Sequence, residues 1–205
     1  MTKLQEIIEV LLSNPLIYRL HSAGVDGAKL SAIQNFRSDY SGLKVLDLGC
    51  GPGNTACLFS GADYTGVDIN EKYIVAARKR YPGLNFIAGD GTRVEWEDGF
   101  DIILINSLLH HLADNQVSEI LLKSAAALTR TGKIIIQEPL IPGKKEWCHR
   151  LMMHLDRGNY FRSLADWKRL LEEAGLFPDG IYFYQLRVFG FKSYHMVSMY
   201  LDKRT

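Results

Sequence analysis

The chain has 205 residues, of which 47% are hydrophobic and 23% are charged, and both fractions are ordinary for a folded globular protein. Its 24 basic and 23 acidic side chains give a formal net charge of +1. This balance excludes a global electrostatic field that would recruit nucleic acid or an anionic membrane. The length predicts one domain with a substantial core.

The cysteine content predicts a reducing compartment. The odd number of cysteines and the lack of a Cys-x-x-Cys pair argue against a disulfide framework and against a zinc knuckle. They are Cys50, Cys57 and Cys148. Apolar residues from Leu4 onward follow helical spacing, and the acidic residues Glu6 and Glu9 interrupt them. No signal peptide or membrane span is therefore expected, and we predict a cytoplasmic protein.

The first 41 residues show helical periodicity and no strand pattern. Two or three helical segments are expected, with interruptions at Asn14–Pro15 and between Gly24 and Gly27, because proline and glycine commonly end helices. Since these segments supply no strand, we expect them to cap a cleft at the edge of the sheet that follows.

From residue 43 onward, strand-like runs alternate with helical periodicity, which is the pattern of a parallel sheet covered by helices on both faces. The expected strands are 43–48, 63–68, 84–88, 100–105 and 132–138. The expected helices are about 53–59, 71–80 and 114–129, with Gly132 as the stop signal of the last one.

The pattern changes after Pro139. A helix is expected over 143–155 and a loop over 156–162. Ser163 and Asp166 resemble a capping box that opens a further helix, which stops at Gly175. Two strand-like runs, about 180–189 and 193–202, form a hairpin-like pair around Gly190.

A glycine-rich turn is the most informative motif. Asp47 is followed by glycines at the alternate positions Gly49, Gly51 and Gly53, and Asp68 ends the next strand 21 residues after Asp47. Glycines let a ligand lie against the main chain, and an acidic group at this distance suits a ribose diol. The dinucleotide fingerprint would need its third glycine at Asn54. Because no phosphate-binding lysine follows either, the motif favours a nucleoside ligand.

At these residues the chain resembles the class I S-adenosylmethionine (SAM)-dependent methyltransferases. The segments 85–91, 100–112 and 128–136 resemble the later strands and loops of this family, and the match covers about residues 43 to 138. The resemblance implies a Rossmann-like three-layer α/β sandwich, with a mostly parallel seven-stranded sheet and an antiparallel last strand. It divides a single domain, residues 1–205, into a helical cap (1–41), a cofactor-binding core (42–138) and a substrate-side insertion with C-terminal strands (139–205).

The resemblance also implies residues that would bind SAM. Each would contact the methionine, ribose or adenine part, and they are Asp47, Gly49, Gly51, Gly53, Asp68, Ile69, Asp90, Gly91 and Asn106. In this assignment Asp68 binds the ribose hydroxyls, and Asp90 with Gly91 holds the adenine edge. Tyr18 in the cap could cover the sulfonium or could belong to the apolar packing of the cap.

Catalytic candidates are His110, His111 and Glu138 at the ends of the fourth and fifth strands. Histidine has a pKa suited to acid–base work, but alternatively one of the two histidines packs in the loop and the other is solvated. Methyl transfer from a sulfonium needs mainly alignment of the acceptor, so no metal is expected, and the product would be S-adenosylhomocysteine.

The acceptor is expected to be a small molecule with an oxygen, nitrogen or carbon nucleophile. The Asn/Asp-Pro-Pro-aromatic tetrad of base methyltransferases is replaced by residues 106–109, Asn-Ser-Leu-Leu, so DNA is not an expected partner. The segment 139–162 could bind an anionic or partly aromatic acceptor or form a solvated loop. It carries the basic residues Lys144, Lys145, Arg157 and Arg162 and the aromatic residues Trp147, Tyr160 and Phe161. Two alternatives stay open, a SAM-binding regulatory or scaffold protein and an NAD-dependent oxidoreductase.

Overall fold

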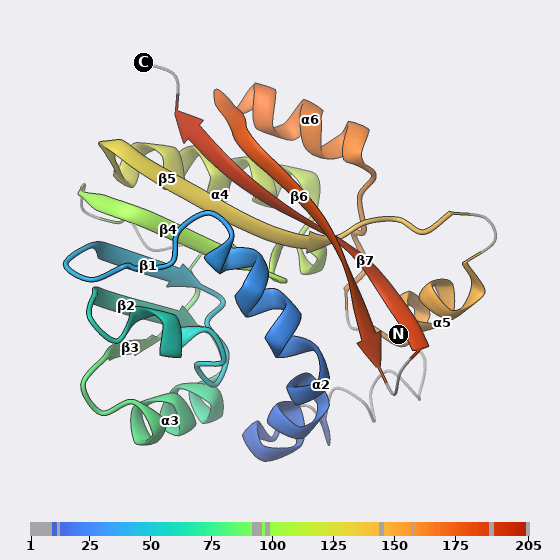
Figure 1. The fold of residues 1–205 in the computed structure, drawn as a ribbon, viewed down its shortest axis with the longest axis horizontal. Coiled ribbons are helices and arrows are strands. Elements are labelled where there is room, and N and C mark those ends of the chain that lie inside the picture. The colour runs from blue at the N-terminus through green and yellow to red at the C-terminus, as the bar shows by residue number, and fades with distance from the viewer. Residues whose placement is uncertain are drawn as a thin grey trace.

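The computed structural model describes residues 10–11, 13–91, 96, 99–143, 146–156, 158–188 and 191–203. They form one seven-stranded sheet with helices on both faces (Figure 1). The strand order is β3-β2-β1-β4-β5-β7-β6. The strands are β1 (Lys44–Leu48), β2 (Asp63–Asp68), β3 (Asn85–Ala88), β4 (Phe100–Asn106), β5 (Leu128–Pro139), β6 (Leu176–Val188) and β7 (Phe191–Lys203).

The first five strands pair in parallel, and β7 lies between β5 and β6 and is antiparallel to both. The Rossmann-like sheet with an antiparallel last strand is therefore confirmed. The strands β6 and β7 are longer than the predicted runs 180–189 and 193–202. In a parallel sheet the carboxyl ends of β1 to β5 meet along one edge, and ligands of such folds bind there.

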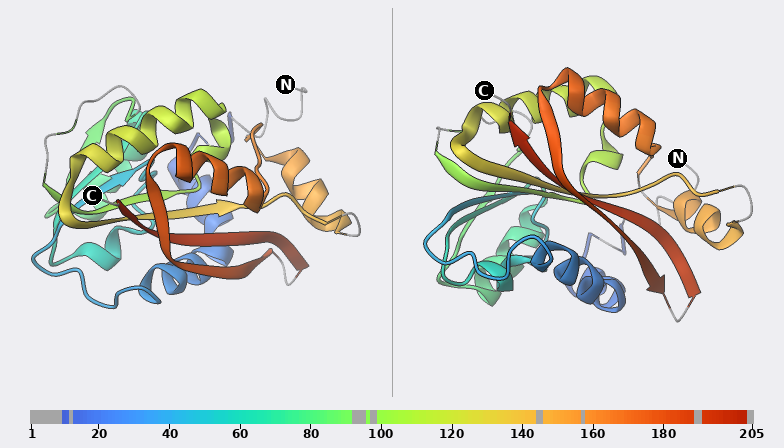
Figure 2. Two further views of the ribbon diagram at one scale, coloured as in Figure 1. Left: turned by 90° about the horizontal axis from the view of Figure 1, so that it is seen from above. Right: turned by 45° about the horizontal axis from the view of Figure 1, so that its top comes forward.

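The helices make two layers, one on each face of the sheet (Figure 2). On one face α4 and α6 cover a core that contains Ile103, Leu121 and Trp167. On the other face η1, α3 and α2 cover a core that contains Phe59 and Ile74. The helices are α2 (Pro15–Gln34), η1 (Ala56–Phe59), α3 (Glu71–Arg80), η2 (Leu109–His111), α4 (Asp114–Ala127), α5 (Trp147–Leu155) and α6 (Leu164–Glu173).

The N-terminal cap contains one long helix where the sequence predicted a break. The side chain of Asn14 caps α2 by accepting hydrogen bonds from the backbone of Leu16 and Ile17, so the predicted boundary at Asn14–Pro15 is confirmed. The predicted interruption between Gly24 and Gly27 is wrong, because α2 runs through both glycines. A glycine costs a helix only about 1 kcal/mol, and the burial of α2 side chains offsets this. Those side chains are Val25, Ala32 and Ile33.

The junction between α4 and β5 also differs from the prediction. The helix ends at Ala127, and Gly132 lies inside β5 instead of stopping the helix. The register shows why: Leu128 pairs with Phe100 and Lys133 pairs with Ile102, so the residues between them form a bulge. A Cβ atom at Gly132 would lie 2.6 Å from the carbonyl oxygen of Phe100. The glycine therefore permits a close backbone approach within the sheet.

Other local predictions differ only in extent. The helix expected over about 53–59 is the short η1, and the helix expected over 143–155 is α5, which begins at Trp147. The capping box is confirmed, since Ser163 accepts from the Asp166 N–H and Asp166 accepts from the Ser163 N–H. None of the helices within the described residues is long and apolar enough to span a bilayer.

Candidate functional site

The glycine-rich turn after β1 is closed by the carboxylate at the end of β2. Gly49, Gly51 and Gly53 have φ angles of 75°, 56° and 76°, a region that side chains other than glycine rarely adopt. Asp68 accepts a hydrogen bond from the Gly51 N–H at 2.9 Å and one from the Asn70 N–H at 2.8 Å. The two predicted elements, glycine turn and spaced aspartate, therefore contact each other directly.

Asp47 is buried beneath this turn, with 1% of its surface exposed. Its Oδ2 accepts hydrogen bonds from the hydroxyls of Thr55 (2.8 Å) and Tyr64 (2.9 Å). Burial raises the pKa of Asp47 to about 6, although the two hydroxyl hydrogen bonds oppose this shift. The carboxylate is thus bound by neutral donors, and a cationic ligand nearby would stabilise its charge.

The remaining predicted cofactor residues follow the ends of β2, β3 and β4. Ile69 is 75% exposed at the end of β2, which leaves its side chain available for packing on a ligand. Asp90 and Gly91 come after β3, and a Cβ at Gly91 would lie 3.2 Å from Leu48 of β1. Asn106 is the last residue of β4. The side chain of Tyr18 lies outside the described residues.

The loop after β4 begins with a strained residue. Ser107 has a φ of 55°, which is uncommon for a residue other than glycine and is found at functional sites. Its Oγ accepts a hydrogen bond from Nζ of Lys29 in α2 at 2.8 Å. Burial lowers the pKa of Lys29 from its usual value, although the charges of Asp26 and Glu138 oppose this. Lys29 therefore links the cap to the site, a role that no motif in the sequence indicates.

The predicted catalytic residues His110 and Glu138 form a buried ion pair. Oε2 of Glu138 lies 2.7 Å from Nδ1 of His110, and its Oε1 accepts the N–H groups of Leu108 and Leu109. On the other side of the ring, Nε2 of His110 lies 3.5 Å from Asp156.

Two carboxylates therefore enclose the imidazole of His110. Burial alone would lower the pKa of His110, but the charges and hydrogen bonds of Glu138 and Asp156 outweigh it and raise the pKa to about 9. Asp156 shows the reverse: burial alone would raise its pKa, but the contact with His110 holds it well below its usual range. At neutral pH His110 is an imidazolium, and it cannot accept a proton. His111 lies beside it, with the two ring centroids 4.2 Å apart.

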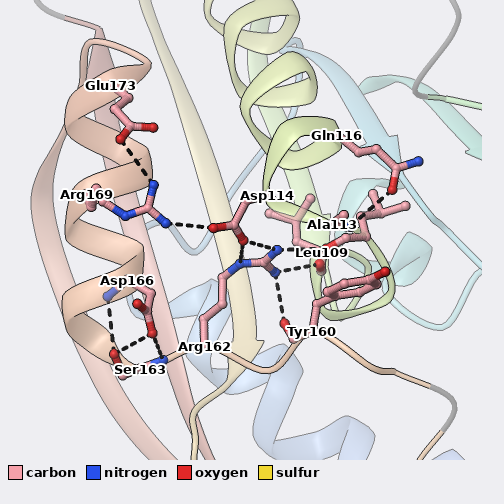
Figure 3. A network of polar contacts seen from close by, with 11 residues as sticks. Leu109, Ala113, Asp114, Gln116, Tyr160, Arg162, Ser163, Asp166, Arg169 and Glu173 are labelled. Atoms are coloured by element: carbon pink, nitrogen blue, oxygen red, sulfur yellow. Dashed lines mark hydrogen bonds and ion pairs between the residues drawn. The ribbon is translucent and has the colours of Figure 1, made fainter.

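Arg162 fixes the backbone around these histidines (Figure 3). Its guanidinium is 4% exposed and donates hydrogen bonds to the carbonyl oxygens of Leu109, Leu112 and Tyr160. It also binds Asp114 at the start of α4. All three of its nitrogens are engaged within the protein, so the expectation that Arg162 could bind an anionic acceptor is wrong. Lys144, Lys145 and Arg157 lie outside the described residues.

Three of these residues show what sequence reasoning missed. The roles of Lys29, Asp156 and the buried Arg162 depend on partners 46 to 108 positions away in the chain. No spacing rule covers such distances. The strand-end positions of Asp68 and Asn106, by contrast, follow from the alternating pattern itself.

The sheet order, the antiparallel β7 and the glycine turn closed by Asp68 define a protein of the class I SAM-dependent methyltransferase type. Residues 45–132 match the family described as methyltransferase domain.

Curated relatives carry methyltransferase names. The chain is 34% identical over 114 residues to a trans-aconitate 2-methyltransferase of Variovorax paradoxus, covering 53% of this chain and 42% of that protein. It is 30% identical over 137 residues to a trans-aconitate 2-methyltransferase of Rhizobium etli, covering 65% of this chain and 50% of that protein. The chain thus spans about half the length or less of these curated relatives.

Solved structures show the same fold at low identity. A SAM-dependent methyltransferase of Leishmania major aligns with a TM-score of 0.76 at 16% identity, over 98% of this chain and 82% of that one. Geranyl diphosphate C-methyltransferase of Streptomyces coelicolor, solved with S-adenosylhomocysteine, aligns with a TM-score of 0.68 at 13% identity. That alignment covers 87% of this chain and 76% of the other.

Proposed function

We propose that this protein transfers a methyl group from SAM to a small-molecule oxygen, nitrogen or carbon acceptor. The observation that carries the proposal is the contact between the Asp68 carboxylate and the Gly51 N–H in the turn after β1. This contact places an acidic group against the glycine-rich turn at the carboxyl edge of the sheet, where ligands of such folds bind. The methyltransferase domain match over residues 45–132 supports it.

Methyl transfer requires the protein to align the reactants more than to supply catalytic groups. SAM supplies a methyl group on a sulfonium, which is already a good leaving group. Alignment of the acceptor in line with the S–CH₃ bond can lower the barrier by about 7–11 kcal/mol. The chain then has to hold the cofactor, orient the acceptor and exclude water.

The proposed cofactor contacts follow the site geometry. Asp68, whose carboxylate lies against the glycine-rich turn, would bind the ribose hydroxyls, and the exposed Ile69 would pack on the adenine. Asp90 and Gly91 would hold the adenine edge. The charge of Asp47, opposed by burial, would be stabilised by the ammonium and sulfonium of SAM.

At the methionine end we propose roles for the glycines and for two further residues. Gly49, Gly51 and Gly53 would let the main chain approach this end, and Asn106 would line it. Tyr18 would cover the sulfonium from the cap. The positive φ angles of the three glycines support the close approach.

We assign the three catalytic candidates different roles. The imidazolium of His110 and its partner Glu138 would position the loop after β4 and would not exchange protons with an acceptor. His111, which is less buried than His110, would be the acid–base candidate. No DNA or membrane partner is proposed, and we keep the cytoplasmic location as a prediction.

Calorimetry on the purified chain tests the cofactor site. Low-micromolar binding of SAM and S-adenosylhomocysteine, about −8 kcal/mol, is expected, with weaker binding of NAD. Asp68→Ala should abolish it, whereas Asp63→Ala, at the exposed opposite end of β2, should leave it unchanged. Equal binding by wild type and Asp68→Ala would contradict this placement, and tighter binding of NAD would revive the oxidoreductase alternative.

Turnover separates an enzyme from a SAM-binding scaffold. Trans-aconitate is the first acceptor to test, because the curated relatives are named trans-aconitate 2-methyltransferases. Formation of S-adenosylhomocysteine that depends on an added acceptor would support the enzyme. Binding without turnover across carboxylate, hydroxyl and amine acceptors would favour the scaffold.

A further inference from the structure

A second cluster of chemically reactive side chains lies away from the glycine-rich turn. Glu146 precedes α5, His149 lies in the first turn of α5, and His195 lies on β7. Each offers one ligand atom, and these three atoms all lie within 4.8 Å of one another. Glu146, the N-cap of α5, and His149 are three positions apart and therefore lie on the same side of the helix start, near the strand that carries His195.

His149 makes this cluster more than a surface ion pair. Glu146 and His195 contact each other directly, and a salt bridge accounts for these two alone. His149 is only 2% exposed, and its Nε2 has no hydrogen-bond partner within the described residues. Buried polar atoms without partners are rare and point to an ion or water that completes the site.

The surroundings of His149 leave its ring able to bind an ion. Nδ1 accepts the backbone N–H of His195 over 3.4 Å, which is at the outer limit for a hydrogen bond. Coordination through Nε2 would place the ring proton on Nδ1 and would sacrifice only this long bond. The side chains of Glu146 and His195 are 35% and 44% exposed, so solvent can reach the cluster from one side.

The donor set determines which ion fits. Two imidazole nitrogens and one carboxylate oxygen match the ligands of zinc and related transition metals. Magnesium and calcium prefer sites made wholly of oxygen ligands. We propose that Glu146, His149 and His195 form a binding site for a divalent transition metal such as Zn²⁺, with a fourth position open to solvent.

Such an ion would fasten the segment after β5 to β7. Leu140 already donates its N–H to the His195 carbonyl oxygen at 2.8 Å, and Tyr194 donates its hydroxyl to Asp156 at 3.0 Å. Asp156 in turn lies beside His110. The proposed metal therefore has a structural role in a segment that borders the proposed acceptor side, and it does not depend on the methyl-transfer proposal.

Metal titration of the full chain tests the site. After treatment with a chelator and its removal, Zn²⁺ is titrated by calorimetry, and thermal unfolding is followed with and without the ion. We expect one Zn²⁺ per chain with a dissociation constant of about 1 µM or tighter, a higher melting temperature, and no comparable effect of Mg²⁺. Co²⁺ in place of Zn²⁺ should give a visible absorption spectrum typical of a low coordination number with nitrogen and oxygen ligands.

Variants localise the ion. His149→Gln and His195→Gln should each weaken Zn²⁺ binding at least about 10-fold, whereas His154→Gln, an exposed histidine of the same helix, should bind like wild type. The exposed His195 makes its variant informative even if His149→Gln fails to fold. Absence of Zn²⁺ binding overturns the proposal. So does wild-type affinity in His195→Gln, which would place the ion elsewhere, such as at His110, His111 and Asp156.

Discussion

The two sides of the site hold their buried charges in different ways. Around the glycine-rich turn, Asp47 is buried among hydroxyl donors, and burial raises its pKa. After β4 and β5, His110 lies between the carboxylates of Glu138 and Asp156, which raise the pKa of the imidazole. On the first side the neighbours of the charge are neutral donors, whereas on the second side charges of opposite sign lie in direct contact.

This difference indicates that one side of the site binds a ligand and the other side stabilises the loops. A buried charge that the protein does not neutralise lowers stability and is favoured only where a ligand compensates it. A network of opposite charges in direct contact is stabilised without a ligand and holds its loops in one arrangement. We infer that the turn side is built to receive the cofactor and that the network side is built to hold the loops around the acceptor.

Removing Arg162, which fixes the backbone on the network side, should have the largest effect. Arg162→Met removes the donors to three carbonyl oxygens and leaves Asp114 without its buried partner, so we expect a loss of about 3–5 kcal/mol in unfolding free energy. Arg169→Met removes the half-exposed pair with the same Asp114 and should lose less than about 1 kcal/mol. Urea denaturation measures both, and equal losses would show that burial does not distinguish them.

The charge of His110 should make stability depend on pH. Its folded pKa of about 9 lies above the usual 6.5, so its contribution is complete below about pH 6.5 and is lost as the pH rises through about 9. We expect the unfolding free energy to fall by roughly 3 kcal/mol over this window. His110→Gln should remove this dependence, and His154→Gln should keep it. Parallel stability curves for wild type and His110→Gln would refute the charged network.

Removing the buried charge of Asp47 should stabilise the ligand-free protein, whereas removing Arg162 destabilises it. The folded pKa of Asp47 is about 6, above the usual 3.8, so its contribution is complete below about pH 3.8 and is lost as the pH rises through about 6. Asp47→Asn should therefore raise the unfolding free energy of the ligand-free protein at pH 7 by about 1–2 kcal/mol. The gain should shrink at pH 4.5, and SAM affinity should fall. Asp63→Asn, which changes an exposed carboxylate of β2, is the control.

Local caps should have the smallest effects and should not differ between the two sides. Asn70 caps α3 near the turn, and Ser163 caps α6 near the network. Asn70→Ala and Ser163→Ala should each lose about 1 kcal/mol of stability by chemical denaturation. A loss more than twice as large at one cap would mean that it takes part in a wider network.

The turn side could be predicted from the sequence because its contacts connect neighbouring strands. Asp68 binds Gly51 across 17 positions, and the spacing of two adjacent parallel strands brings them together. The network side could not be predicted, because Arg162 reaches Leu109 across 53 positions and His110 reaches Glu138 across 28. Histidines and an arginine in loops have many possible partners, and only the tertiary arrangement selects among them.

Two wrong predictions about the secondary structure have similar causes. Gly24 and Gly27 have the local preference of a helix end, but packing of α2 on the strands keeps the helix continuous. Gly132 reads as a helix stop, but the register of β4 and β5 places it in a bulge. In both cases a long-range contact outweighed a preference of about 1 kcal/mol.

The contacts of α2, and of the residue just after it, with β5 and β7 also bear on how the chain folds. Phe36, just after α2, stacks on Tyr200 of β7 with ring centroids 4.3 Å apart, and Gln137 of β5 donates to the Lys29 carbonyl oxygen. Contacts between such distant positions slow folding, because long loops must close before the contacts form. During synthesis α2 emerges early and must wait for β7 to leave the ribosome. The cap is therefore expected to dock last, after the central strands have already assembled.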